Sequence, residues 1–143
     1  MSGEQLRALA KRVPAHYIQK KPGGFAADYI SHSEITQMLL AKLGPFDQRI
    51  VEVIRSPEGV VDGVVLEMTF EIDGRTVTVQ EAGDCDHPSK NNGANLKNAV
   101  SSAVNRCAMR VGLGLELWSR EFYVLDQALE AKHNKEGADD GAE

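Results

Sequence analysis

The segment VVLEMTFEI, residues 64–72, alternates apolar and polar side chains with a period of two. Because successive side chains of a strand point to opposite faces, this alternation predicts a half-buried antiparallel strand. Asp73-Gly74 follows directly, which is the strongest short signal for a hairpin turn, and residues 75–82, RTVTVQEA, predict the returning strand. One face of the hairpin must therefore be covered by another layer. That face is predicted to consist of Val64, Leu66, Met68, Phe70 and Ile72.

A third strand and three short helices are predicted around this hairpin. Residues 49–55, RIVEVIR, are apolar and β-branched, which favours a strand. The sequence SHSE at residues 31–34 is typical of a capping box, with Ser31 as N-cap and Glu34 at N3, and this helix ends near residue 44. Residues 4–13 predict a helix that ends at Pro14, and residues 119–129 predict a last helix that buries Phe122.

Residues 96–112, LKNAVSSAVNRCAMRVG, predict a long amphipathic helix, because their apolar side chains recur at steps of three and four. Its other face carries hydroxyl, amide and basic groups, and Gly112 ends it. The order of elements predicts an α+β fold, a three-stranded antiparallel β-meander packed by a long helix (a β-β-β-α core) with an N-terminal helical segment. One domain is expected over residues 1–129. Residues 130–143 lack apolar periodicity, which predicts a disordered acidic tail.

The composition limits the cellular compartment that we expect for the protein, and its net charge hides an uneven distribution of charge along the chain. No run of about 18 apolar residues is present, no signal-peptide pattern opens the chain, and two cysteines make no disulfide framework, so we expect a soluble cytoplasmic protein. The net charge is −5, with 21 acidic and 16 basic residues. No acid occurs between Asp86 and Glu116, although this stretch contains four bases. These are Lys90, Lys97, Arg106 and Arg110.

Two interpretations of this basic helix are open. Cations separated by small hydroxyl and amide side chains suit a sugar–phosphate backbone, and a carboxylate among them would oppose the phosphate charge. The plainer interpretation is the ordinary solvated face of an amphipathic helix.

A set of motifs in a fixed order favours the first interpretation. HYIQKK, ADYISH with AKLG, the EIDGRTVTVQEAG hairpin and KNAVSSAVNRCAMRVG together resemble the annealing domain of the Rad fifty-two family of recombination proteins, including its small phage and bacterial members. The shared order includes a Glu-x-Gly turn before the long helix, and the resemblance covers about residues 13–115.

The resemblance implies a protein that anneals complementary single strands of DNA without ATP in homologous recombination and repair. Such a protein is not an enzyme and uses no cofactor. Its subunits form a homo-oligomer, a ring or a helical filament, whose basic groove holds single-stranded DNA by the backbone. A single-strand-binding protein is a further candidate partner, no membrane is involved, and a phage-encoded member would act in the cytoplasm of its bacterial host.

The resemblance also assigns positions. The basic residue after the first Tyr-Ile falls on Lys21, Asn105-Arg106 occupies the family's Lys-Arg pair, and Met109 stands where the family has an arginine. Two lost cations make this groove less positive, unless other basic residues compensate. The candidate DNA-binding residues are Lys20, Lys21, Lys90, Lys97, Ser101, Asn105, Arg106 and Arg110.

Two other functions are weighed against DNA binding. DCDH, residues 84–87, gathers thiol, carboxylates and imidazole, so a small metal- or thiol-dependent enzyme using the Cys85–His87 loop is one alternative. Zinc needs three or four protein ligands, however, and the other histidines form no paired motif. An oligomeric scaffold without a nucleic-acid role is the other alternative.

Aromatic side chains add a second way to hold a single strand, because bases stack on them. Tyr17, Phe25 and Tyr29 are candidates for stacking, although packing in the core or at a subunit interface is the plainer role for Phe25 and Tyr29. Trp118 lies among apolar neighbours and is predicted to belong to the core.

Overall fold

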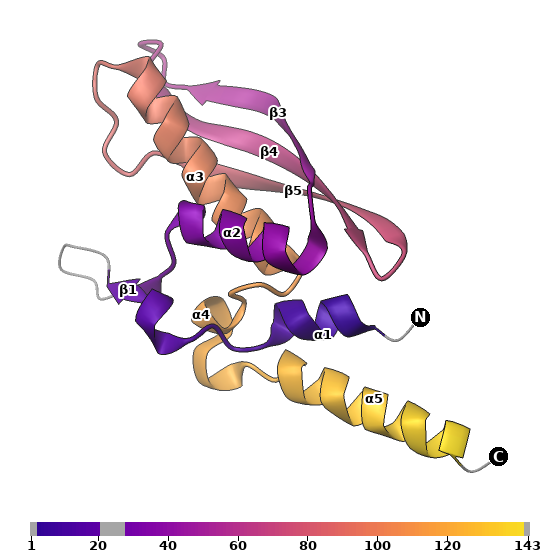
Figure 1. The fold of residues 1–143 in the computed structure, drawn as a ribbon. Coiled ribbons are helices and arrows are strands. Elements are labelled where there is room, and N and C mark those ends of the chain that lie inside the picture. Colours follow the sequence, from indigo (N-terminus) through magenta and orange to yellow (C-terminus); the bar gives the residue numbers. More distant parts are fainter. Residues whose placement is uncertain (1–2, 21–27, 142–143) are drawn as a thin grey trace.

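The computed structural model of the chain describes residues 3–20 and 28–141, with side chains described as far as residue 138. A three-stranded antiparallel sheet packs against one long helix, which confirms the predicted α+β class (Figure 1). Within the described residues, no helix has the length and apolar content to cross a membrane. The elements in chain order are α1 (Glu4–Ala10), a 3-10 turn (Ala15–Tyr17), β1 (Gln19–Lys20), β2 (Asp28–Tyr29), α2 (His32–Leu43), β3 (Asp47–Arg55), β4 (Val61–Ile72), β5 (Arg75–Asp84), α3 (Asn92–Arg110), α4 (Glu116–Ser119), a second 3-10 turn (Arg120–Phe122) and α5 (Leu125–Gly141).

The sheet has the order β3-β4-β5, so the alternating strand β4 lies at its centre. The predicted inward face of β4 is confirmed, since each of its five apolar side chains is buried. Asp73 and Gly74 both have positive φ, which is the backbone of a type I′ hairpin turn. The Asp73 carboxylate also accepts hydrogen bonds from the backbone N–H groups of Gln5 and Leu6, so the hairpin turn caps the start of α1.

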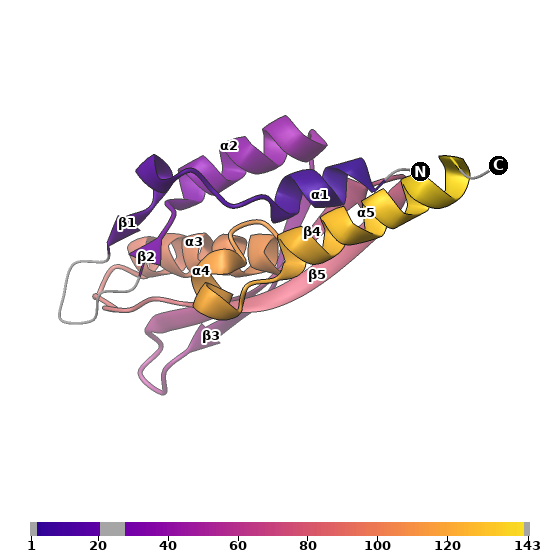
Figure 2. The same ribbon diagram turned by 90° about the horizontal axis from the view of Figure 1, so that it is seen from below.

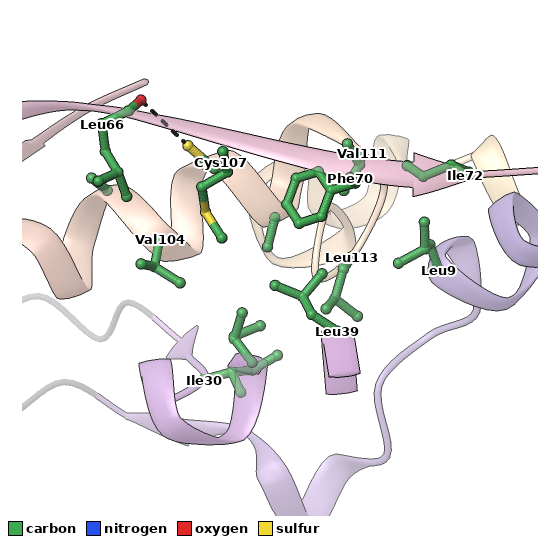
Figure 3. Packing of buried hydrophobic residues seen from close by; sticks show 14 of the residues in the cluster. Leu9, Ile30, Leu39, Leu66, Phe70, Ile72, Val104, Cys107, Val111 and Leu113 are labelled. Carbon is green, nitrogen blue, oxygen red and sulfur yellow. Dashed lines mark hydrogen bonds between the residues drawn. The ribbon is translucent and has the colours of Figure 1, made fainter. Parts of the chain in front are cut away.

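Helix α3 forms a middle layer, with the sheet on one side and α2 on the other (Figure 2). The core lies at these two contacts, where Cys107 of α3 donates through its Sγ to the Leu66 carbonyl and Val104 faces the region of Ile30 (Figure 3). Helix α2 begins as predicted, because the Ser31 hydroxyl accepts a hydrogen bond from the Glu34 backbone N–H.

Helix α3 approaches strand β5 closely at Gly83. A Cβ on Gly83 would stand 2.3 Å from the Ala99 carbonyl oxygen and 2.4 Å from the Ala103 nitrogen, so a side chain is excluded there. Residues 81–83 lie inside β5, which extends to Asp84, and the expected Glu-x-Gly turn is therefore a strand. The glycine is needed for helix–sheet packing and not for a turn.

Two predicted helix boundaries are wrong. Helix α1 ends at Ala10, and Lys11 already has an extended backbone. Pro14 disfavours the helical region only at Val13, whose N–H donates to the buried carboxylate of Glu116 at 2.7 Å. The segment predicted as one helix over residues 119–129 is divided between α4, a 3-10 turn and the start of α5. Phe122, predicted to be buried there, is 78% exposed.

The predicted disordered tail is also wrong over residues 130–141, which continue α5. Ion pairs hold the first turns of this helix: Arg12 with Asp126 at 3.6 Å and Arg7 with Glu130 at 3.8 Å. These contacts place α5 beside α1 (Figures 1 and 2). Alanine, glutamate and lysine, which have high helix propensity, then extend the helix despite its lack of an apolar stripe. The domain boundary expected at residue 129 therefore falls inside helix α5.

Candidate nucleic-acid interface

Two of the predicted DNA-binding residues converge on one carboxylate. Arg106 and Arg110 lie one turn apart on α3, and Glu81 lies opposite Leu66 on the inward face of β5. The Arg106 Nε donates to Glu81 Oε1 at 3.4 Å, and the Arg110 Nε donates to Glu81 Oε2. The carboxylate is 11% exposed, whereas the Arg106 and Arg110 side chains are 38% and 57% exposed. The cluster therefore presents guanidinium groups to solvent and its carboxylate to the protein.

The charge state of this cluster follows from its contacts. Burial raises the pKa of Glu81, but the hydrogen bonds and charges of Arg110 and Arg106 together lower it further, so this pKa lies below its ordinary value. Glu81 is consequently ionised at neutral pH. Two guanidinium groups against one carboxylate leave this three-residue cluster with one net positive charge, while a second β5 carboxylate, Asp84, is contacted by the Ser102 hydroxyl of α3 at 3.5 Å.

Trp118 is the third component of this edge. The Arg106 guanidinium lies over its ring, with Cζ 5.0 Å from the ring centroid, in the geometry of a cation–π contact. Trp118 is 50% exposed, so the prediction that it belongs to the core is wrong. Glu81 and Trp118 together fix Arg106 in one orientation.

Lys90 and Lys97 do not belong to this cluster. Lys97 and Arg106 are about two and a half turns apart, which puts them on opposite sides of α3. Lys90 and Lys97 are exposed and form no ion pair within residues 3–20 and 28–141. Ser101 donates its hydroxyl to the Lys97 carbonyl at 3.0 Å, inside the helix. The basic residues of α3 thus line two edges and not one stripe.

The structure also separates the remaining candidates from the cluster. Lys20 of β1 pairs with Asp28 of β2 at 3.6 Å, and Lys21 lies outside the described residues. Asn105 is half-buried, and its Nδ2 donates to the Ile30 carbonyl at 2.7 Å. The Asn105 amide therefore has a structural role, since it ties α3 to the chain entering α2, and its contact with DNA stays a prediction.

The DCDH loop is held by a buried amide. Asn95 of α3 accepts hydrogen bonds from the Ser89 N–H at 2.8 Å and from the Cys85 Sγ at 3.7 Å, and its Nδ2 donates to the Ser89 carbonyl. Cys85 is buried while His87 is exposed, so the loop does not present thiol and imidazole together. The part of the chain that the structure describes contains no group of three side chains able to hold a metal ion.

Two other candidate aromatic residues, Tyr17 and Tyr29, lie near β1 and β2. Tyr29 donates its hydroxyl to Gln19 Oε1 at 3.0 Å, and Tyr17 packs partly against the core with its ring beside that of His16. Phe25 lies outside the described residues.

No family model matches this chain, and a search of curated proteins finds no match either.

Glu81 and Trp118 were not predicted as parts of the site. The position of Glu81 was detectable in the sequence. It follows Val77 and Val79 at steps of two residues, so its side chain lies with theirs on the inward face of the strand. An inward carboxylate requires a basic partner from the covering layer. Trp118 has no such signal, since its apolar neighbours in the chain favour burial.

Proposed function

We propose that this protein binds single-stranded DNA by its phosphate backbone and anneals complementary strands without a nucleotide cofactor, as a small protein of the Rad fifty-two type in recombination or repair. The observation that carries the proposal is the exposed pair Arg106 and Arg110, oriented by Glu81 and carrying excess positive charge. Guanidinium groups fixed in this way are suited to phosphate oxygens. The three-stranded meander packed by α3 has the β-β-β-α order that the resemblance implies.

Assembly is part of this proposal. One subunit offers few phosphate contacts, and repeating them along one strand raises the affinity because later contacts are intramolecular. The edge strand β3 supports assembly, since Ile50, Val51 and Ile54 are exposed and its outer edge is unpaired within the described residues. The oligomer would be a ring or a helical filament acting in the cytoplasm, with a single-strand-binding protein as a further partner.

The test is annealing of two complementary labelled oligonucleotides without nucleotide, with affinity for each single strand measured over a range of salt concentrations. Arg106→Ala is expected to weaken binding by about tenfold at low salt and to flatten the slope of log K against log salt by about 0.7. The variant should remain folded, because Arg110 still pairs with Glu81.

Arg12→Ala is the matched control. Arg12 is an exposed arginine that pairs with Asp126 at 3.6 Å and lies over the Tyr123 ring, away from α3 and β3. It is expected to leave affinity and salt slope unchanged. Equal effects of the two substitutions, or no annealing by the parent protein, would contradict the proposal.

A scaffold without a nucleic-acid role is the second candidate. The scaffold is favoured by the ion pairs of Arg106 and Arg110 with Glu81, because the Glu81 carboxylate offsets one of the two arginine charges. Self-association without any salt-dependent binding of single strands would select this candidate.

A further inference from the structure

The segment that carries Trp118 is anchored on both sides. Before it, the buried Glu116 carboxylate accepts the Val13 N–H at 2.7 Å, and Leu117 packs partly against the core. After it, the Tyr123 hydroxyl donates to the Ala10 carbonyl in the interior. Trp118 lies between these anchors and remains 50% exposed. An indole ring is thus held at the surface by a short, fixed segment.

The Arg106 guanidinium restricts this ring further. It lies over the ring at 5.0 Å and is itself hydrogen-bonded to Glu81. The guanidinium covers one face of the half-exposed ring, so a base would stack on the other face, next to an exposed cation; this arrangement is complementary to one repeating unit of a single strand, a base joined to a phosphate.

We infer that Trp118 is a stacking platform for a base of single-stranded nucleic acid whose neighbouring phosphate is bound by Arg106 and Arg110. This inference rests on the proposed function and extends it from the backbone to the bases. Stacking is tolerant of sequence, because every base has a flat face, and this suits a protein that anneals any complementary pair.

The test uses the intrinsic fluorescence of Trp118, which is the single tryptophan of the chain. The full-length protein is titrated with a labelled oligodeoxythymidylate and with an abasic oligonucleotide of equal length, while anisotropy of the label reports binding separately. The thymidine strand is expected to quench the tryptophan, and the abasic strand to bind more weakly without quenching.

Trp118→Ala is expected to weaken binding of the thymidine strand by about 5- to 150-fold and to weaken binding of the abasic strand much less, since Glu81 still orients Arg106. Trp118→Tyr should restore most of the loss. Phe122→Ala is the matched control, since Phe122 is an exposed aromatic residue close in the chain that has no cation–π contact within the described part of the protein. This control variant is expected to keep the parent's preference for the thymidine strand over the abasic strand.

Each contrary result has a distinct meaning. Binding of both strands with equal affinity and no quenching would overturn the stacking role and leave backbone binding intact. Absence of binding to either strand would overturn the proposed function together with this inference. A change in sedimentation mass on Trp118→Ala, without a change in the preference for bases, would assign the ring to a subunit interface and also overturn it.

Discussion

Glu81 explains why the facing edge of α3 carries arginines and no carboxylate. Its carboxylate is largely buried on the inward face of β5, and an ionised group in that position requires cations close by. Arg106 and Arg110 meet this requirement from the helix and still reach solvent. The two arginines at this edge of the helix therefore have a structural role that holds whether or not DNA binds.

Glu81→Gln separates the structural and binding roles of the two arginines. Removing the carboxylate charge raises the local charge by one while the amide can still accept a hydrogen bond. If the arginines bind phosphate, the affinity for single-stranded DNA is expected to rise several-fold at low salt, with a salt slope steeper by up to about 0.7. Fluorescence anisotropy over a salt series measures both quantities.

Glu67→Gln serves as the control for that substitution. Hydrogen bonds from Gln80 and Arg49 lower the pKa of Glu67, so it too is an ionised carboxylate paired with an arginine, but on the outer face of the sheet. The same change of charge is expected to have no comparable effect there. An affinity that responds equally to both substitutions would indicate a general effect of net charge and contradict the role of Arg106 and Arg110.

At the scale of elements, the contact between α3 and β5 positions the whole site. Ala99 and Ala103 of the helix lie against the backbone of Gly83, so helix and strand meet without an intervening side chain. This close approach brings Arg106 and Arg110, further along the same helix, within reach of Glu81, two residues before Gly83 in the same strand. Small residues at the contact thus determine the geometry of the arginine pair.

Gly83→Ala is expected to lower the free energy of unfolding by about 1–3 kcal/mol or more, because the added methyl group would overlap the α3 backbone. Gly137→Ala in α5 is the control, since no atom lies within 4 Å of its added Cβ. That control should be neutral or stabilising by up to about 1 kcal/mol, as expected for alanine in an exposed helix. Urea unfolding measures both, and a Gly83 variant as stable as the parent would show that helix and strand are not in this close contact.

For the whole molecule, the layers leave one strand of the sheet uncovered. Helix α3 packs on β4 and β5 (Figure 1). Most residues of β3 are exposed. Ile50 lies opposite Leu66 and thus on the inward face, yet it is 43% exposed. An apolar edge strand of this kind is available for pairing with another chain.

Ile50→Lys is expected to disrupt the proposed oligomer, because a charge on an edge strand opposes pairing between sheets. Sedimentation should give a parent mass several times the 15.6 kDa of one chain and a variant mass close to that of one chain. Leu40→Lys on α2 removes a similarly exposed apolar side chain away from this edge and should preserve the parent mass. A monomeric parent, or an Ile50 variant of unchanged mass, would contradict assembly through β3.

Local patterns were sufficient to predict the elements that determine the fold class. The alternation along β4, the Asp73-Gly74 turn and the Ser31 cap each depend on neighbours close in sequence, and the structure confirms all three. The apolar face of α3 was predictable for the same reason, since helical periodicity identifies buried positions without knowledge of what covers them.

Tertiary structure alone decided which polar and aromatic groups meet. Asn105 was predicted at a DNA surface, but α2 lies over that side of α3 and its entry segment takes the amide. Trp118 was predicted in the core, but anchors from α1 and its linker hold its segment at the surface. Residues 130–141 were predicted to be disordered, but α5 begins with ion pairs to α1. In each case the deciding partner lies more than seventy positions away in the chain, so periodicity, which records only near neighbours, carries no information about it.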